Sequence, residues 1–383
     1  MIRFYIILIL FLAALFCIFK APEYHLWYVA IVVTCYPLVF AAITAIVTAT
    51  GFWVHKWQLG GTLLGVLTFL FYISPVIRTY RIAGHIKADM TKALSGLNGH
   101  AAPLFPSDKQ PFRFGDLLKS AKNIPCKTIT YVTYKDTSLT LDFFRSQLPG
   151  DRPCIINVHG GSWEGGDNKQ IPEINSYLAQ KGYNVAAINY RLAPKWQTPA
   201  PVEDVKACMA YCRQHAAELH IDTGNFVILG RSAGSQIALL AAYSLHDPAI
   251  KGVIDFYGPA DMVWGYSIPA NPLILDSRKV MNEYVGGTYS QVPEKFRASS
   301  PVEWVDKNSP PTLIIHGTND VWVSPEHCRR LIRKLQPNGV KYYWLLIPWA
   351  THGFDYNING PGGQLSTFAV ETFINSVTNP QTP

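Results

Sequence analysis

A serine stands at the centre of the pentapeptide GRSAG, residues 230–234, between the apolar run FVILG and an apolar helical pattern. A serine hydroxyl is a weak nucleophile at neutral pH and attacks a carbonyl only when a neighbouring base takes its proton. In a G-x-S-x-G turn between a strand and a helix, the small flanking residues leave the serine exposed. We therefore predict that Ser232 is a catalytic nucleophile; the alternative is an ordinary turn in which Ser232 only caps the helix.

The base and its acidic partner have candidates in two later loops. In chains that place the nucleophile on such a turn, the order is serine, then acid, then histidine. The stretch HGTNDVWV puts Asp320 just beyond one apolar run, and THGFD puts His352 just beyond the next. Because the carboxyl ends of parallel strands meet at one edge of a sheet, we expect both side chains to converge on Ser232. His352 would deprotonate the serine while Asp320 orients the imidazole.

Other acids and histidines nearby are weaker candidates. His316 precedes the acid loop and is expected to be structural, and His327 falls within a helical run and is expected at the surface. Asp255 lies inside an apolar strand, and Asp306 does not follow the end of one. None of these positions suits a side chain that must reach a nucleophile beyond the end of a strand.

The stretch HGGSWEGGD, residues 159–167, follows the apolar run CIINV, and its glycines indicate backbone that comes close to another group. Attack on a carbonyl places negative charge on its oxygen, and fixed backbone N–H groups stabilise that charge. Glycine has no side chain to block the approach of such backbone. We predict an oxyanion hole formed by the amides of Gly161, Ser162 and Ala233, with Gly160 shaping the turn. The alternative is a tight turn that only returns the chain to a helix.

Two residues beside these loops are candidates for the substrate pocket. Trp163 has a side chain large enough to form a pocket wall. Arg231 sits inside the serine turn, where it would either attract an acidic group of the substrate or pair with a surface carboxylate. We favour the carboxylate pair.

Short apolar runs alternate with helical patterns throughout residues 126–383, which predicts one domain with a mostly parallel sheet covered by helices on both faces. The segment from residue 257 to 310 separates two of the strands and is expected to help cover the site. Strands are expected at 127–134, 139–144, 154–159, 184–190, 226–230, 253–258, 312–317 and 342–347, and helices at 169–180, 201–219, 232–244, 324–335 and 363–377.

Six motifs in this order resemble the α/β-hydrolase superfamily: HGGSW, NYRLAP, PAPVEDV, GRSAG, HGTND and THGF. They are similar to its esterase and lipase branch, which includes hormone-sensitive-lipase-like, feruloyl-esterase-like (BD-FAE) and prenylcysteine-methylesterase-like enzymes. The resemblance covers about residues 125–380 and implies hydrolysis of carboxylic esters through an acyl-enzyme, without a cofactor.

This sequence departs from the family pattern at two positions and matches it at two structural ones. Ser162 replaces the third glycine of the lipase-type HGGG motif, and Arg231 stands where Asp, Gln or His is more usual. Arg191 and Asp204 match positions that the family uses structurally, so we expect a pair that braces the chain beside the sheet.

The first 77 residues differ in composition from the rest of the chain. Three uncharged, mainly apolar runs cover residues 4–19, 26–54 and 57–77. A membrane-spanning helix needs about 20 apolar residues, so we predict a transmembrane region of three helices, which contacts membrane lipids. A cleaved signal peptide is the alternative for the first run, but Lys20 stands where a small residue would be expected at a cleavage site.

The formal net charge is +7, yet residues 126–383 hold equal numbers of basic and acidic side chains, 22 of each. The excess lies beside the apolar runs, in a basic juxtamembrane segment and linker at 78–125 that Arg78, Arg81 and Lys87 begin. This distribution is typical of a positive-inside flank and not of a nucleic-acid-binding face. We therefore predict a multi-pass membrane protein with its large domain in the cytoplasm.

The 7 cysteines include no C-x-x-C pair, so the sequence predicts neither a zinc site nor a disulfide framework. We expect no metal and no cofactor. The leading hypothesis is a membrane-anchored serine hydrolase that cleaves carboxylic esters, the substrate being a small molecule and lipidic if the anchor places the pocket near a bilayer. The alternatives are an amidase of the arylformamidase type, a prenylcysteine-methylesterase-like enzyme and a catalytically inactive, hydrolase-like binding protein.

Overall fold

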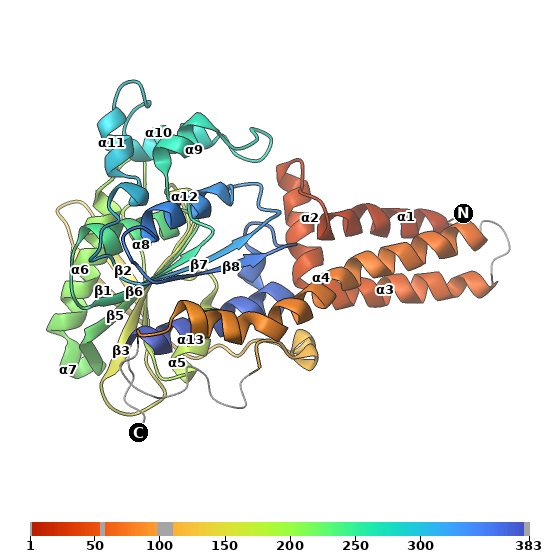
Figure 1. The fold of residues 1–383 in the computed structure, drawn as a ribbon, viewed down its shortest axis with the longest axis horizontal. Helices are drawn as coiled ribbons and strands as arrows, with labels where there is room; N and C mark the ends of the chain where they lie inside the picture. The colour runs from red at the N-terminus through yellow and green to blue at the C-terminus, as the bar shows by residue number, and fades with distance from the viewer. Residues whose placement is uncertain (1, 54–57, 98–109, 379–383) are drawn as a thin grey trace.

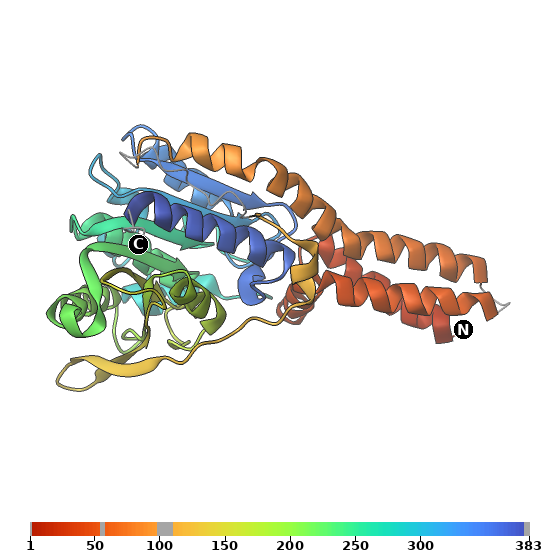
Figure 2. The same cartoon turned by 90° about the horizontal axis from the view of Figure 1, so that it is seen from below.

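The computed structural model describes residues 2–53, 58–97 and 110–378. A twisted sheet with helices on both faces forms the larger part, and a bundle of N-terminal helices projects from one end of it (Figures 1 and 2). Residues 98–109 of the expected linker and residues 54–57 at the border of two apolar runs lie outside the described residues.

The sheet has 8 strands in the order β1-β2-β4-β3-β5-β6-β7-β8. β2 is antiparallel to both of its neighbours, and the strands from β4 to β8 run parallel. The predicted α/β-hydrolase fold is therefore confirmed. The strands are β1 (Lys127–Thr133), β2 (Ser138–Phe144), β3 (Arg152–Val158), β4 (Asn184–Ile188), β5 (Ile221–Arg231), β6 (Ile250–Phe256), β7 (Thr312–Gly317) and β8 (Tyr342–Ile347).

Helices bury both faces of the sheet, which is why its central strands read as continuous apolar runs. One face packs against α6, α8 and α12, and the other against α5, α13 and the second half of α4. The expected helix at 201–219 is divided at His215 into α6 and α7. The helices of this domain are α5 (Pro172–Gln180), α6 (Ala200–Gln214), α7 (Ala216–Leu219), α8 (Ala233–Ser244), α9 (Met262–Ser267), α10 (Ser277–Val285), α11 (Pro293–Ala298), α12 (Glu326–Leu335) and α13 (Pro361–Thr378).

The N-terminal region differs from the three straight spans predicted from the sequence. Its helices are α1 (Ile2–Ala14), α2 (Tyr24–Cys35), α3 (Pro37–Ala49) and α4 (Gln58–Ala93). The second apolar run is broken between α2 and α3, which meet at 87°. Proline lacks an N–H for the helix and disfavours helical backbone in the residue before it, so Pro37 ends α2 at Cys35.

Within the described ranges, α4 is the single unbroken helix long and apolar enough to cross a membrane. It contains 36 residues, and its second half is the start of the basic juxtamembrane segment that we expected from Arg78 onward. That half packs on the sheet because Ile82, Ile86 and Met90, spaced one turn apart, are buried against it. One helix therefore belongs to both the bundle and the core of the domain (Figure 2).

Candidate active site

The GRSAG turn is formed by the end of β5 and the start of α8. Ser232 has φ 53° and ψ −122°, a conformation that is costly for a residue with a side chain. A Cβ atom on Gly230 would lie 2.2 Å from the carbonyl oxygen of Gly234, and one on Gly234 would lie 2.2 Å from that of His159. The two glycines of GRSAG are therefore required by the close passage of backbone around Ser232.

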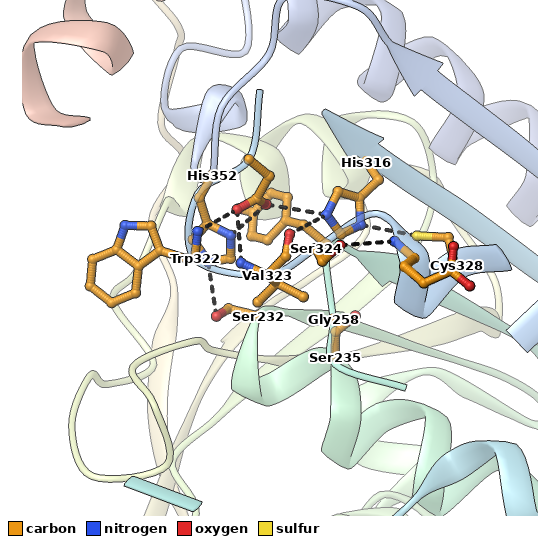
Figure 3. Close-up of polar contacts among 12 residues, drawn as sticks. Ser232, Ser235, Gly258, His316, Trp322, Val323, Ser324, Cys328 and His352 are labelled. Carbon is orange, nitrogen blue, oxygen red and sulfur yellow. Dashed lines mark hydrogen bonds and ion pairs between the residues drawn. The ribbon is translucent and has the colours of Figure 1, made fainter. Parts of the chain in front are cut away.

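The side chains of Ser232, His352 and Asp320 meet at the carboxyl edge of the sheet, as the sequence predicted. Figure 3 labels the first two of them. The Nε2 atom of His352 lies 2.9 Å from the Oγ atom of Ser232, and its Nδ1 atom lies 2.8 Å from Oδ2 of Asp320. Both distances are those of hydrogen bonds. His352 and Asp320 are buried, at 6% and 2% exposed.

The second oxygen of Asp320 is held by its own loop. Oδ1 accepts hydrogen bonds from the amides of Trp322 and Val323, at 2.8 and 2.9 Å. Burial alone would raise the pKa of this carboxyl group, but the two histidines that face it, His352 and His316, hold the pKa well below its ordinary value. The group is therefore ionised and able to stabilise an imidazolium.

His316 contacts this arrangement in a way that sequence reasoning missed. Its Nε2 atom lies 3.2 Å from Oδ2 of Asp320 and 3.0 Å from the carbonyl oxygen of Val323, and its Nδ1 atom lies 3.0 Å from the sulfur of Cys328. The motif HGTND could have predicted this contact, because a residue at the end of β7 lies at the same edge of the sheet as the loop that follows it.

The prediction that His327 lies at the surface is wrong. The side chain is 5% exposed and accepts a hydrogen bond from the amide of Asp261. The apolar positions of α12, at Cys328, Leu331 and Leu335, place residue 327 on the same buried face of the helix. Helical spacing would have identified this.

The register of the sheet brings the HGGSW loop next to Ser232. Val158, the last residue of β3, pairs with Gly230 of β5, so the loop that follows β3 passes beside the serine turn. Gly161 has φ 128°, and a Cβ atom there would lie 2.2 Å from the carbonyl oxygen of Gly165. Ser162 follows in the left-handed region at φ 53°.

The structure separates the four residues predicted for the oxyanion hole into two groups. The amide of Gly160 donates to Oε1 of Gln170 at 2.8 Å, so it is already occupied. In the described part of the chain we find no acceptor for the amides of Gly161 and Ser162, and Ala233 is the first residue of α8, where an amide has no partner within the helix.

The two candidate pocket residues have different surroundings. Trp163 lines a cavity, stacks on Tyr284 with ring centroids 4.6 Å apart, and donates from its indole to Gln236. Arg231 pairs with Asp355, Nε to Oδ2 at 2.6 Å, and both side chains are buried, at 3% and 4% exposed. The carboxylate that we expected at the surface is thus a buried one, just after His352. The pair joins the GRSAG turn to the loop that carries His352.

The pair expected at Arg191 and Asp204 is present, with Nε of the arginine 2.8 Å from the carboxylate. Asp204 is fully buried and also accepts hydrogen bonds from the amide of residue 191 and from the hydroxyl of Tyr134. These contacts attach the start of α6 to the chain after β4, as expected for a pair that braces the chain beside the sheet.

Two cavities adjoin Ser232. The first, which we call the large pocket, has a volume of about 420 Å³ and contains Trp163 and Ser162 in its wall. The second, the small pocket, has a volume of about 140 Å³ and is lined by His352, Arg231 and the glycines of the HGGSW loop. The volume of the large pocket is in the range of small-molecule sites.

Comparison with known proteins places this chain in a family. The family model BD-FAE matches residues 141–335. The esterase LipC of Mycobacterium tuberculosis is 30% identical over 259 residues, covering 63% of this chain and 63% of that protein. The esterase LipQ of the same organism is 29% identical over 231 residues, covering 56% of this chain and 54% of LipQ. The chain thus matches less than two thirds of the length of these relatives.

Solved structures agree on the fold. Esterase 2 of Thermogutta terrifontis, in a form phosphonylated by sarin, has a TM-score of 0.58 and 22% identity, covering 67% of this chain and 97% of that one. An acetyl ester-xyloside bifunctional hydrolase from Caldicellulosiruptor lactoaceticus has a TM-score of 0.54 and 19% identity, covering 67% and 98%. Because the BD-FAE model matches half of the chain, the chain belongs to the BD-FAE family, within the esterase and lipase branch of the α/β hydrolases.

Proposed function

We propose that this protein is a serine hydrolase that cleaves carboxylic esters, with Ser232 as nucleophile, His352 as general base and acid, and Asp320 as the group that orients His352. The observation that carries the proposal is the continuous contact from Oγ of Ser232 to Nε2 of His352, 2.9 Å, and from Nδ1 of His352 to Asp320, 2.8 Å. The names of the relatives, LipC and LipQ, describe esterases and support the same reaction class.

The reaction proceeds in two halves. Oγ of Ser232 bonds to the carbonyl carbon while its proton passes to Nε2 of His352, and the carbonyl oxygen becomes negative. The C–O bond to the alcohol then breaks, and His352 returns the proton to the departing alcohol oxygen. Water, deprotonated by His352, attacks the acyl-enzyme, and release of the acid restores Ser232. The amides of Gly161, Ser162 and Ala233 stabilise the negative oxygen in both halves.

The N-terminal bundle is proposed to attach the enzyme to a membrane. Among the described residues, 19 of the 26 large hydrophobic side chains that are exposed lie before residue 81. In the most apolar stretch of α4, 33% of the residues are buried, unlike the core helix of a soluble domain. Exposed apolar area on this scale is stable only against lipid or protein. α2, which carries Tyr24, Trp27 and Tyr28, would lie at the interface, where such aromatic side chains are enriched.

The test is hydrolysis by the full-length chain in detergent micelles. Wild type, Ser232→Ala and Ser232→Cys are compared on p-nitrophenyl esters and on N-formylkynurenine, which carries the amide that an arylformamidase would cleave. We expect ester cleavage by the wild type and a loss of about 10⁶-fold in kcat for Ser232→Ala. Ester activity that survives in Ser232→Ala excludes the proposal. Cleavage of the formamide in preference to every ester would assign the same site to an amidase, and inactivity on both would favour a binding protein.

A further inference from the structure

The N-terminal region contacts both loops that carry the catalytic base and its acid. The indole Nε1 of Trp27 donates to the backbone carbonyl of His352 at 3.0 Å. Nζ of Lys20 lies 3.4 Å from the carbonyl oxygen of Asp320, and the amide group of Asn319 donates to the carbonyl of Ile18 at 3.1 Å. The segment from residue 18 to 27 therefore packs directly on the active site, as well as joining two helices of the bundle.

The same segment lines both cavities beside the nucleophile. Lys20, Ala21 and Pro22 form part of the wall of the large pocket, whereas Trp27 forms part of the wall of the small one. Ala21 is 4% exposed and Trp27 is 7% exposed. Trp27 also packs on Trp322, with ring centroids 4.7 Å apart, and Trp322 stacks on His352 at 5.8 Å.

Hydrogen bonds close the N-terminal segment onto the loop between α9 and α10. The amide of Tyr24 donates to the carbonyl of Leu273 at 3.0 Å, and the side chain of Asn271 donates to the carbonyl of Pro22 at 2.9 Å. In Figure 1 this loop reaches toward the start of α2. Ile268 in this loop lines the large pocket and is 61% exposed, so the rim of the pocket carries an apolar side chain here.

The position of His352 indicates which half of an ester occupies each pocket. His352 must protonate the alcohol oxygen as it leaves, so the alcohol departs on the histidine side of Ser232. His352 lines the small pocket and is absent from the wall of the large one. The acyl chain then extends into the large pocket, whose apolar wall includes Trp163, Met262, Ile274, Leu275, Val280 and Met281.

We infer that the N-terminal region is part of the substrate site, with residues 20–22 closing a pocket for an apolar acyl chain and Trp27 closing a smaller pocket for the alcohol. The substrate class is an ester of a medium or long acyl chain with a small alcohol. The inference rests on the proposed function, because it assumes that Ser232 and His352 perform the reaction.

Ala21→Phe tests the acyl pocket in the full-length chain. The added ring would fill part of the large pocket, so kcat/KM for p-nitrophenyl dodecanoate should fall about tenfold more than kcat/KM for the acetate, since pocket contacts with even one methylene are worth about tenfold or more. The matched control is Ala42→Phe, which adds the same ring at an exposed position of α3. The control should leave the ratio of the two esters unchanged.

Trp27→Phe tests the alcohol pocket. The smaller ring enlarges that pocket, so the ratio of kcat/KM for butyl butanoate to that for methyl butanoate should rise about tenfold. The ratio is informative even if the loss of the hydrogen bond to the carbonyl of His352 changes both rates. Trp304→Phe is the control, because the indole of Trp304 makes a similar hydrogen bond, 2.8 Å to the carbonyl of Ala298, at an exposed site on another loop.

The outcomes separate this inference from the proposed function. If the unaltered chain hydrolyses none of these esters, the proposed function fails. If it hydrolyses them but both ratios are the same in the variants as in the wild type, the N-terminal region is only an anchor and the inference is overturned. It is also overturned if Ala21→Phe changes the alcohol ratio and Trp27→Phe changes the acyl ratio, because the two halves of the ester would then be reversed.

Discussion

The imidazole of His316 contacts the carboxylate of Asp320, with Nε2 3.2 Å from the oxygen that also faces His352. Asp320 therefore lies between two histidines, and Figure 3 shows both imidazoles at the edge of the sheet. Burial opposes the charged form of His316, but the sulfur of Cys328 and the carboxylate of Asp320 together raise the pKa of His316 above its usual value. A charged imidazole at this place would hold Asp320 in the rotamer that meets His352.

His316→Ala should lower kcat about tenfold and change KM little, because a hydrogen bond to a charged group is worth about 1.5–3 kcal/mol. His316→Gln retains an N–H near the position of Nε2 and should recover part of the loss. Steady-state kinetics on one short ester distinguishes these outcomes. A variant with wild-type kcat, or a glutamine variant no better than the alanine one, would show that His316 does not position Asp320.

Gly161→Ala should lower kcat by about 10²–10³-fold, which is the effect of losing a donor from an oxyanion hole. The added Cβ would lie 2.2 Å from the carbonyl of Gly165, at a φ of 128°, so the loop must move. Gly165→Ala is the matched control, because its Cβ would meet only the carbonyl of Gly161, 4.0 Å away. Equal activity of the two variants would remove Gly161 from the oxyanion hole.

The HGGSW loop also carries a carboxyl group that responds to pH. Burial raises the pKa of Glu164 to about 7, and the neighbouring carboxyl of Glu283 on α10 contributes. Because the folded state holds this proton to a higher pH than the unfolded state does, the free energy of unfolding should fall as pH rises from about 4.5 to about 7. Denaturant-induced unfolding, measured at several pH values across this range, should show a smaller fall in the free energy of unfolding for Glu164→Gln than for the wild type. The exposed control Glu303→Gln should behave as the wild type. Identical curves for all three proteins would contradict this.

The side of the membrane on which the domain lies, if the proposed attachment holds, can be determined with one cysteine. Cys126 is exposed, and the other 6 cysteines, all of them within the described ranges, are buried. If the catalytic domain is cytoplasmic, a membrane-impermeant maleimide should label inside-out vesicles and leave intact cells unlabelled. Cys126→Ser should abolish the signal. Labelling of intact cells would place the domain on the opposite side.

The local motifs could be predicted from the sequence because each forms a short turn with its own steric requirements. GRSAG and HGGSW could be identified because their glycines are required where two stretches of backbone pass close together. The order of the loops that carry Asp320 and His352 follows from the topology of the sheet. The same reasoning predicted the strands and the layers of helices, since buried parallel strands and amphipathic helices have different apolar spacing.

The contacts between the N-terminal region and the active-site loops could not be predicted from local sequence patterns. Trp27 and His352 are 325 positions apart, and no local pattern connects an indole in an apolar helix with a distant backbone carbonyl. The buried partner of Arg231 was missed for the same reason. The break at Pro37 was missed for a different reason. The proline was noted, but membrane helices tolerate proline, so composition alone could not show whether Pro37 bends one helix or ends it.

The most direct measurement is the site of covalent modification by a fluorophosphonate, mapped by mass spectrometry on the full-length chain. The account predicts a single adduct on Ser232 that forms rapidly in the wild type, slowly in His352→Ala and in Asp320→Ala, and never in Ser232→Ala. Absence of the adduct from folded wild-type protein, or its presence on another residue, would contradict the assignment of Ser232, His352 and Asp320 as the catalytic triad.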